Sequence, residues 1–346
     1  MTKVCTYIVL LNWNGWRDTT ACLESVLQSL NAQFRVVVCD NNSADGSLSK
    51  IAAWARGEIS ASQPQNERLS ALVGGATRPV KHAMLTASEV HSGSVTDKGE
   101  PLILIDNQKN LGFAAGNNVG LRYALNQPDM SHVWILNNDT LIDPYCLSNM
   151  HSRLQRETTP TVCGSIIHFF DSPETIQAIG GCGFNRRTGV ALQTEGRFRA
   201  EHEVDDCSLI EEKIDYVSGC SMLIPRCLLE SVGLLNEDYF LYYEEIDWFT
   251  RAGTSFRPCI AADAHVYHRE GGSIGSPNWR QAKPSLVADF HLFRSKHLFM
   301  RKYHSGNLAW CYLSSYLEIG KRIMRGQFGN ARVVLSVLFG AKALRQ

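Results

Sequence analysis

Residues 132–143, HVWILNNDTLID, join an apolar run to three polar residues in succession. The run from His132 to Leu136 is typical of a buried strand. Asn137, Asn138 and Asp139 follow at once, and a polar group left unpaired at the end of a buried strand costs about 1–3 kcal/mol. The sequence therefore raises the question of what these three side chains hold.

The composition is that of a folded globular protein. The chain has 346 residues, of which 44% are hydrophobic and 20% charged, and its 34 basic residues balance 34 acidic ones. This length suits one large α/β domain with an appendage, or two domains. The neutral balance argues against a nucleic-acid partner, which normally selects a basic surplus.

Cysteine usage and hydropathy bear on the compartment. The 11 cysteines are scattered singly, with no CxxC pair. Buried free thiols in a reducing compartment explain this better than a disulfide framework or a zinc site. The N-terminal apolar run has no small-residue cleavage site after it, so it is interpreted as a strand and not a signal peptide. No stretch of about 18 uncharged apolar residues predicts a spanning helix. We therefore expect a cytoplasmic protein.

The first part of the chain alternates between apolar runs and amphipathic segments. Its expected elements are strands at 4–11, 34–39, 101–106 and 132–136, and helices at 18–30, 47–56 and 113–126. Such alternation predicts an α/β fold with a doubly wound, mostly parallel sheet flanked by helices. Residues 57–100 lose this periodicity and are expected to form a mobile surface insertion.

The pattern changes beyond residue 160. The expected elements there are strands at 162–170 and around a bend in 214–226, a helix within 239–253, and helices at 285–303, 307–324 and 329–343. We predict one domain over residues 1–280 and a helical C-terminal extension over residues 281–346.

Ligands of a parallel sheet bind at the carboxyl ends of its strands. The polar segments that follow directly on predicted strands are Asn12–Trp16, Asp40–Asn42, Asn107–Asn110 and Asn137–Asp139. We expect them to meet in one crevice. Asp139 is the best-placed carboxylate for a divalent cation, because Mg²⁺ is held by one or two carboxylates together with substrate phosphates. A helix cap or a turn after the strand explains Asp139 equally well.

Two further segments have both a structural and a binding interpretation. Asp40 and Asn42 open the turn-forming string DNNSADGS, where a carboxylate can also accept from a ribose hydroxyl or a base N–H. The string NLGFAAGNN at 110–118 places small residues at the start of a helix, where an anionic ligand could approach. This string is neither a dinucleotide fingerprint nor a P-loop, and tight helix packing explains it almost as well.

Three carboxylates, Glu244, Glu245 and Asp247, follow an aromatic stretch at 240–243. Aromatic surroundings raise the pKa of a carboxylate towards the range of a general base. The alternative is an acid-rich first turn of a helix, which the helix dipole favours. Because the apolar flank predicts partial burial, we favour a catalytic role.

His268 opens the string HREGGS at 268–273. Imidazole is a common metal ligand, and Gly271-Gly272 would let the loop fold over a phosphate. A lone histidine is more often structural, so the metal role requires Asp139 to lie close by. His265 is a weaker competitor.

Taken in order from about Tyr7 to about Ser273, these segments resemble the family 2 glycosyltransferases, inverting enzymes with the GT-A fold. The strings that carry the resemblance are IVLLNWNG (8–15), CDNNSADGS (39–47), NLGFAAGNN (110–118), LNNDT (136–140), SGCSMLIPR (218–226), YYEEIDW (242–248) and HREGGS (268–273). No single string is specific, whereas seven in register are. Within the family the chain looks most like the bacterial rhamnosyltransferase-type branch, which builds cell-surface polysaccharide.

The resemblance implies a metal site that holds Mg²⁺ or Mn²⁺. Residues 137–139 occupy the family's Asp-x-Asp position, with Asp139 as the metal ligand and Asn137 in place of the first Asp. His268 matches a later ligand of the metal or the diphosphate. The residues that the resemblance implies for the nucleotide sugar are Asn12, Asp40, Asn42, Asn110, Gly112, Asn118 and Asn138.

The resemblance also implies a general base. Glu245 matches it, although the family usually has the shorter Asp there, and Glu244 and Asp247 remain candidates. The metal would neutralise the departing diphosphate. The base would take the proton of an acceptor hydroxyl, and the anomeric carbon would invert. The implied partners are a nucleoside diphosphate sugar and a saccharide or lipid-linked acceptor.

Two other functions stay open. A sugar-phosphate nucleotidyltransferase normally has a Gly-rich basic loop after its first strand, but NWNGWRD at 12–18 contains one glycine. A nucleotide-sugar-binding homologue without activity is kept open by Asn137 and Glu245, and is opposed by the acids retained at 242–247.

The C-terminal helices have two interpretations of equal weight. They carry aromatic, leucine, lysine and arginine residues at helical spacing. They could lie on a membrane, at the inner face of the plasma membrane near a lipid-linked acceptor. They could instead pack against the domain or a homodimer partner.

Overall fold

The computed structural model describes residues 5–93, 99–193, 197–200, 207–253, 257–269 and 283–341. Its strands are β1 (Cys5–Asn12), β2 (Phe34–Asp40), β3 (His82–Thr86), β4 (Leu102–Asp106), β5 (Met130–Asn137), β6 (Thr140–Ile142), β7 (Cys163–Phe169), β8 (Ser172–Ile179), β9 (Gly181–Asn185), β10 (Val190–Gln193), β11 (Tyr216–Val217), β12 (Ser221–Pro225) and β13 (Cys259–His268). Its α-helices are α1 (Trp16–Leu27), α2 (Ser47–Arg56), α3 (Glu67–Ser70), α4 (Ala87–Ser92), α5 (Gly112–Leu125), α6 (Cys146–Leu154), α7 (Ser208–Glu211), α8 (Arg226–Val232), α9 (Glu244–Ala252), α10 (Leu286–Tyr303), α11 (Leu308–Met324) and α12 (Phe328–Leu338).

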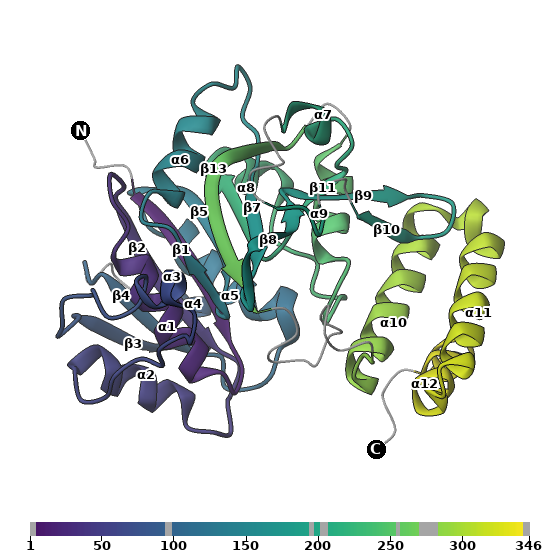
Figure 1. Cartoon of the computed structure of the whole chain (residues 1–346), viewed down its shortest axis with the longest axis horizontal. Helices are drawn as coiled ribbons and strands as arrows, with labels where there is room; N and C mark the ends of the chain where they lie inside the picture. The colour runs from purple at the N-terminus through teal and green to yellow at the C-terminus, as the bar shows by residue number, and fades with distance from the viewer. Residues whose placement is uncertain are drawn as a thin grey trace.

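A mixed sheet forms the centre of the molecule, with strand order β3-β4-β2-β1-β5-β12-β7-β13-β6 (Figure 1). The first five strands of this order are parallel, whereas β12 runs antiparallel to both β5 and β7. Tyr7 and Val9 of β1 point into a core shared with α5, α8 and α9, and Ile8 and Leu10 point into a core shared with α1, α2 and α6. The predicted α/β fold, with a mostly parallel sheet covered by helices on both faces, is confirmed.

The stretch 57–100 contains more regular structure than the sequence predicts. β3 extends the parallel sheet beside β4, and α4 follows it with a capping box between Thr86 and Glu89. Both elements are too short to show a periodicity in the sequence. This stretch is therefore in part the edge of the sheet and not only a surface insertion.

The turns that lead into β3 are held by a buried carboxylate on α1. Glu24 accepts a hydrogen bond from Trp54 Nε1 at 2.9 Å and from the backbone N–H groups of Gly74 and Ala76, both at 3.1 Å. The Glu24 side chain is fully buried, so these donors have a partner that water cannot replace.

A second, three-stranded sheet of order β10-β9-β11 reaches towards the C-terminal helices (Figure 1). Phe299 and Met300 of α10 pack in the same core as Phe184 of β9. α10, α11 and α12 also share a small core of their own, to which Phe293 and Val334 contribute. The predicted helical extension is present, and its first helix is built into the domain.

We predict that Glu24→Ala lowers the free energy of unfolding by about 3 kcal/mol, because the buried Trp54 indole and two loop N–H groups lose their acceptor. Urea denaturation followed by circular dichroism measures this. Glu58→Ala is the matched control, since Glu58 is exposed and pairs only with Arg56 among the described residues, and little change is expected there. Equal effects of the two substitutions would show that Glu24 does not anchor the 57–80 segment.

Candidate active site

Polar side chains at the ends of β2, β1 and β5 form one hydrogen-bonded network. Asn12 Nδ2 donates to Asp40 Oδ1 at 2.5 Å and to Ser43 Oγ at 3.1 Å, and Asn12 Oδ1 accepts from Thr19 Oγ1 at 2.8 Å. Asn138 Nδ2 donates to the same Thr19 oxygen at 2.9 Å. The structure thus brings three of the predicted strand-end segments together at one edge of the sheet.

Within this network, Asp40 has the turn role that the sequence suggested. Asp40 Oδ2 accepts from the Ser43 backbone N–H at 2.9 Å. Asn42 is exposed and has a left-handed backbone, with φ 55°. Contact of either residue with a nucleotide stays a prediction.

The segment 110–118 is explained by packing. Gly112 has φ +76°, and a Cβ atom there would lie 2.3 Å from the Phe240 carbonyl oxygen. Asn110 Oδ1 accepts from the Gly112 N–H at 3.0 Å. Asn118 is fully buried, and the Leu235 backbone engages both ends of its amide, at 2.8 and 3.0 Å. The amide of Asn118 thus holds the loop before α9, which explains this residue by packing, and its contact with a nucleotide sugar stays a prediction.

Asp139 and His268 lie side by side, as the metal interpretation requires. Asp139 Oδ1 is 3.3 Å from His268 Nε2, and Asn137 Nδ2 is 3.2 Å from the same nitrogen. Burial lowers the pKa of His268, but the neighbouring Cys220 and the Asp139 carboxylate raise it, and the net pKa lies well above its ordinary value. His265, the weaker competitor, contacts His168 instead, at 3.0 Å.

A small hollow of about 30 Å³ opens beside Asp139. Its lining includes Arg17 and Asp18 of α1, Gln63 of the 57–100 stretch, and Arg269. The sequence analysis did not select these residues, although Arg269 directly follows His268 and α1 begins just after β1. The described residues contain no cluster of three or more His, Cys, Asp or Glu side chains suited to a metal. The Gly271-Gly272 loop lies outside the described residues.

Glu244 and Glu245 begin α9 as a buried, interacting pair. Glu244 is 3% exposed, and its Oε2 has no hydrogen-bond partner among the described residues. Burial raises the pKa of Glu244 well above its ordinary value, and the charge of Glu245 raises it further. Burial also raises the pKa of Glu245, while hydrogen bonds from the Gly219 N–H and from Glu244 limit the rise. Of the two carboxyl groups, Glu244 is the one whose protonated form burial and its neighbour favour more strongly.

A strained turn places this acid pair. Tyr242 and Tyr243 both have positive φ, 65° and 73°, which costs about 1–2 kcal/mol for each side-chain-bearing residue. Tyr243 is 5% exposed, packs against Phe184 and Phe299, and donates from its hydroxyl to the Gly189 carbonyl. The packing of Tyr243 thus holds a conformation that the backbone alone would avoid.

The structure removes Asp247 from the candidates for the general base. Its side chain is fully buried, and it accepts from Arg251 Nε at 2.8 Å, Lys302 Nζ at 3.0 Å and Tyr303 Oη at 2.9 Å. Burial alone would raise the pKa of Asp247, but these hydrogen bonds hold it below its ordinary value. A carboxylate so fully engaged anchors α10 to α9 and has no oxygen left for a substrate.

Glu245 and Asp139 are connected through a short chain of neighbours. Glu245 Oε1 accepts from the Gly219 N–H at 3.2 Å, and Cys220 is the next residue. Cys220 hydrogen-bonds His268, which lies beside Asp139. The Cys220 carbonyl also accepts from the Asn137 N–H at 2.9 Å. The predicted base and the predicted metal ligand therefore lie at the same edge of the central sheet.

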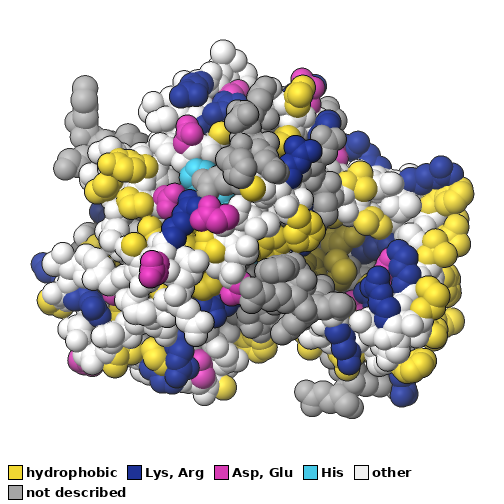
Figure 2. Space-filling model, viewed as in Figure 1, with side chains coloured by type: hydrophobic (Ala, Val, Ile, Leu, Met, Phe, Trp, Pro, Cys, Tyr) yellow, Lys and Arg dark blue, Asp and Glu magenta, His cyan; other side chains and the backbone are white. Residues whose placement is uncertain are grey.

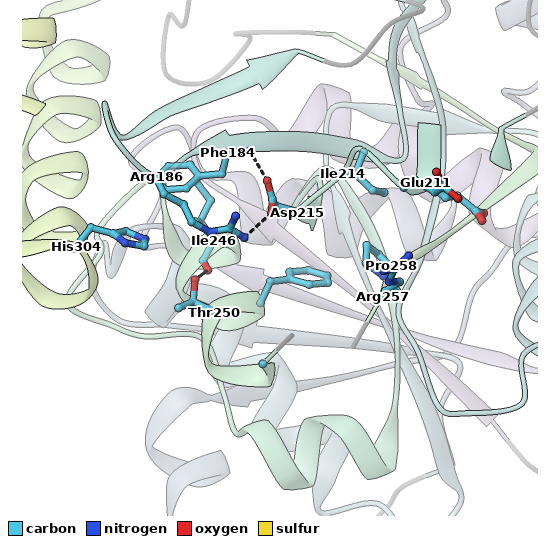
Figure 3. Close-up of a pocket in the computed structure, with 13 residues that line it drawn as sticks. Phe184, Arg186, Glu211, Ile214, Asp215, Ile246, Thr250, Arg257, Pro258 and His304 are labelled. Atoms are coloured by element: carbon cyan, nitrogen blue, oxygen red, sulfur yellow. Dashed lines mark hydrogen bonds and ion pairs between the residues drawn. The ribbon is translucent and has the colours of Figure 1, made fainter. Parts of the chain in front are cut away.

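A larger pocket of about 340 Å³ lies elsewhere, between β9, α9 and the start of β13 (Figure 3). Phe184, Ile246 and Phe249 form apolar walls, and Arg186 is paired with Asp215 across its rim at 2.7 Å. None of the residues predicted from the sequence for catalysis, metal or nucleotide lines it.

Comparison with known proteins finds similar sequences and similar folds. Residues 87–216 match the sequence profile described as Glycosyl transferase family 2. A 148-residue stretch is 28% identical to the low-salt glycan biosynthesis hexosyltransferase Agl10 of Haloferax volcanii. That match covers 43% of this chain and 45% of Agl10, so it spans less than half of the relative's length.

Solved structures share the fold. A mannosyltransferase from Pyrobaculum calidifontis, PcManGT, in complex with GDP-Man and Mn²⁺, superposes with a TM-score of 0.51 at 16% identity, over 98% of this chain and 76% of that one. GalNAc-T7 with UDP, GalNAc and Mn²⁺ gives a TM-score of 0.51 at 11% identity, over 85% of this chain and 47% of that one. Residues 87–216 therefore carry a sequence signature of the family 2 glycosyltransferases, within a chain that has the GT-A type architecture.

Proposed function

We propose that the protein is an inverting, metal-dependent glycosyltransferase that moves a sugar from a nucleoside diphosphate sugar to an acceptor hydroxyl during glycan synthesis. The observation that carries this is the placement of Glu245, a carboxylate with a raised pKa, at the same sheet edge as the Asp139–His268 pair. The similar proteins include one named for glycan biosynthesis and others solved with nucleotide sugars or nucleotides. We extend this to a rhamnosyltransferase-like role in cell-surface polysaccharide synthesis.

Asp139 and His268 fit Mg²⁺ or Mn²⁺. One carboxylate and one imidazole leave most of the coordination sphere to phosphate oxygens and water, which is how these ions are commonly held with nucleotides. The bound ion would supply Lewis-acid stabilisation of the departing diphosphate. Arg17 and Arg269 line the hollow beside Asp139 and add positive charge where a diphosphate would lie.

Glu245 would act as the general base. Its carboxylate takes the proton of the acceptor hydroxyl as that oxygen attacks the anomeric carbon, and the bond to the diphosphate breaks on the opposite face. Glu244 keeps its own proton and orients Glu245 through their hydrogen bond. Direct displacement by the acceptor gives inversion, without a covalent sugar intermediate.

We further propose a cytoplasmic location. All 11 cysteines are free, and nine of them are buried. Reduced thiols of this kind suit a reducing compartment.

We predict that Asp139→Ala lowers sugar transfer at least a hundredfold, about 2.7 kcal/mol in the activation barrier, because the site loses its metal carboxylate. A panel of UDP-, GDP- and dTDP-linked sugars with Mn²⁺ first identifies the donor by thermal shift. The variant should keep its melting temperature without metal but lose the rise that Mn²⁺ and donor produce together.

Asp106→Ala is the matched control for Asp139→Ala. Asp106 ends β4 at the same edge of the sheet, and its Oδ1 caps only the local Gln108 N–H among the described residues. Equal turnover by Asp139→Ala and wild type would disprove the metal assignment. Release of pyrophosphate from a nucleoside triphosphate and a sugar phosphate would instead support nucleotidyl transfer.

We predict opposite results for the same change at two adjacent residues. Glu245→Gln removes the base, and we expect transfer to fall by about two to four orders of magnitude while donor binding persists. Glu244→Gln keeps a neutral hydrogen-bond donor beside Glu245, so most of the activity should remain. Steady-state kinetics on both variants measures this, and equal loss of kcat in the two would remove Glu245 from the role of base.

The raised pKa of Glu244 also predicts a pH effect on stability. Its folded-state pKa lies above the ordinary value of 4.5, so its stabilising contribution is full below that value and is lost as pH rises through the folded pKa. Glu244→Gln cannot lose a proton. We therefore expect the free energy of unfolding of Glu244→Gln to increase relative to that of wild type as pH rises above 4.5. The increase should be at most about 1.4 kcal/mol per pH unit. Urea titrations across this range measure the difference, and a constant difference would contradict the buried, protonated state.

A further inference from the structure

The outer surface of α11 is apolar, and most of it is exposed. Trp310, Leu313, Leu317 and Met324 are 44, 47, 60 and 81% exposed. Their spacing of three, four and seven residues places them on one side of the helix. Figure 2 shows hydrophobic side chains along the edge of the molecule that α11 forms in Figure 1.

The opposite side of the same helix is already used. Cys311, Ser315, Ile319 and Arg322 are buried against the rest of the helical extension. α11 therefore exposes an apolar side, whereas a surface helix of a globular protein normally exposes its polar side. Exposed apolar residues also lie at both ends of α12, where Phe328 at its start and Phe339 directly after it are 67 and 79% exposed. A contiguous exposed apolar surface of this kind marks an interaction site.

Charge indicates what this surface contacts. Residues 283–341 contain nine Lys or Arg residues against two acids, Asp289 and Glu318, in a chain whose formal net charge is zero. Arg322 engages both acids, at 2.7 and 2.9 Å, and Lys321 pairs with Glu318 as well. The extension thus has a large positive surplus, and both of its carboxylates are neutralised internally.

The cations lie beside the apolar surface. Lys321 and Arg325 are exposed, one helical turn apart, along its border. Arg187, from the turn between β9 and β10, stacks on the Trp310 ring at 3.7 Å from its centre. An apolar stripe with tryptophan and tyrosine, bordered by Lys and Arg, is the pattern of a helix that lies in the interface of an anionic bilayer.

We propose that the outer surface of α11, continued by α12, docks the protein on an anionic lipid bilayer. None of the helices among the described residues is long and apolar enough to cross a membrane, so this helix lies along the surface. A second copy of the chain fits less well, because the same surfaces would bring two basic extensions together. The proposal does not depend on the sugar-transfer activity, since lipid binding needs neither donor nor metal.

Co-sedimentation of the full chain with vesicles tests the proposal. The vesicles contain phosphatidylcholine alone or mixed with phosphatidylglycerol. We expect wild type to bind the mixed vesicles, to bind neutral vesicles at least tenfold more weakly, and to lose affinity as salt is raised. Absence of binding to the anionic vesicles at low salt would overturn the proposal.

Matched variants separate the surface from general stickiness. The double variant Leu317→Glu, Met324→Glu should reduce the partition coefficient at least tenfold, because it places two charges where apolar groups would enter the bilayer. Leu209→Glu is the control, since Leu209 is 65% exposed on α7, outside the extension, and it should bind as wild type does. Arg325→Gln should lower binding to anionic vesicles by about fivefold.

Circular dichroism and thermal melting verify that the variants are folded. Unchanged vesicle binding by the folded double variant would overturn the proposal. Sedimentation equilibrium without lipid measures whether the chain forms a dimer. A dimer that the double variant dissociates, with no vesicle binding by wild type, would assign the surface to a second copy.

Discussion

Asn12, at the end of the central strand β1, makes the hydrogen bonds that hold the strand ends together. A parallel sheet buried on both faces delivers polar residues to its carboxyl edge, and each must find a partner or remain orphaned at a cost of about 1–3 kcal/mol. Asn12 forms hydrogen bonds with Asp40 and Thr19, and Thr19 accepts a hydrogen bond from Asn138. The network satisfies these amides internally.

This lateral network also decides which of residues 137–139 remains for a ligand. Asn138 is turned inward to Thr19, and Asn137 contacts His268. Asp139 is the one whose carboxylate borders the hollow with Arg17 and Arg269. Because its two neighbours make hydrogen bonds within the fold, the metal site that we propose rests on a single carboxylate of residues 137–139.

The sequence predicted well those helices and strands whose apolar patterns are long. The predicted helix 47–56 agrees with α2, and the predicted strand–bend–strand at 214–226 became β11, a turn and β12. It missed β3 and α4, since five or six residues carry too little periodicity and their stability comes from pairing with β4 and from a capping box.

The site was predicted in part for a related reason. A motif identifies residue types and spacing, but burial decides their roles. Glu244, Glu245 and Asp247 could not be told apart in the sequence, because the distinction comes from Lys302 and Tyr303, which lie more than fifty positions away along the chain. The packing role of Asn118 could not be predicted for the same reason, since its partner Leu235 belongs to a distant loop. Arg269 lies within the HREGGS string, but neither Arg269 nor Arg17 was predicted as a site residue, and their position beside Asp139 was found only from the geometry.

The Asp247 cluster also joins the two parts of the molecule. Lys302 and Tyr303 end α10, and both bind the carboxylate that lies two residues after Glu245 on α9. Ser295 of α10 donates to the Leu241 carbonyl, just before the strained tyrosine turn. The C-terminal extension therefore contacts the chain both before and after Glu245, the proposed base.

These contacts fix the position of the basic, apolar extension relative to the proposed base. A helix tethered loosely would bring the protein to a bilayer without fixing its orientation. Here α10 is joined to α9 by hydrogen bonds from Lys302 and Tyr303 to the fully buried Asp247 carboxylate, and such charge-assisted hydrogen bonds are strong. α11 packs on α10 through Ile319 and Phe293 in one small core. A bilayer that bound the outer surface of α11 would thus fix the angle between the membrane and the sheet edge beside which Glu245 lies. An acceptor hydroxyl at the membrane surface would then approach the crevice from a constant direction.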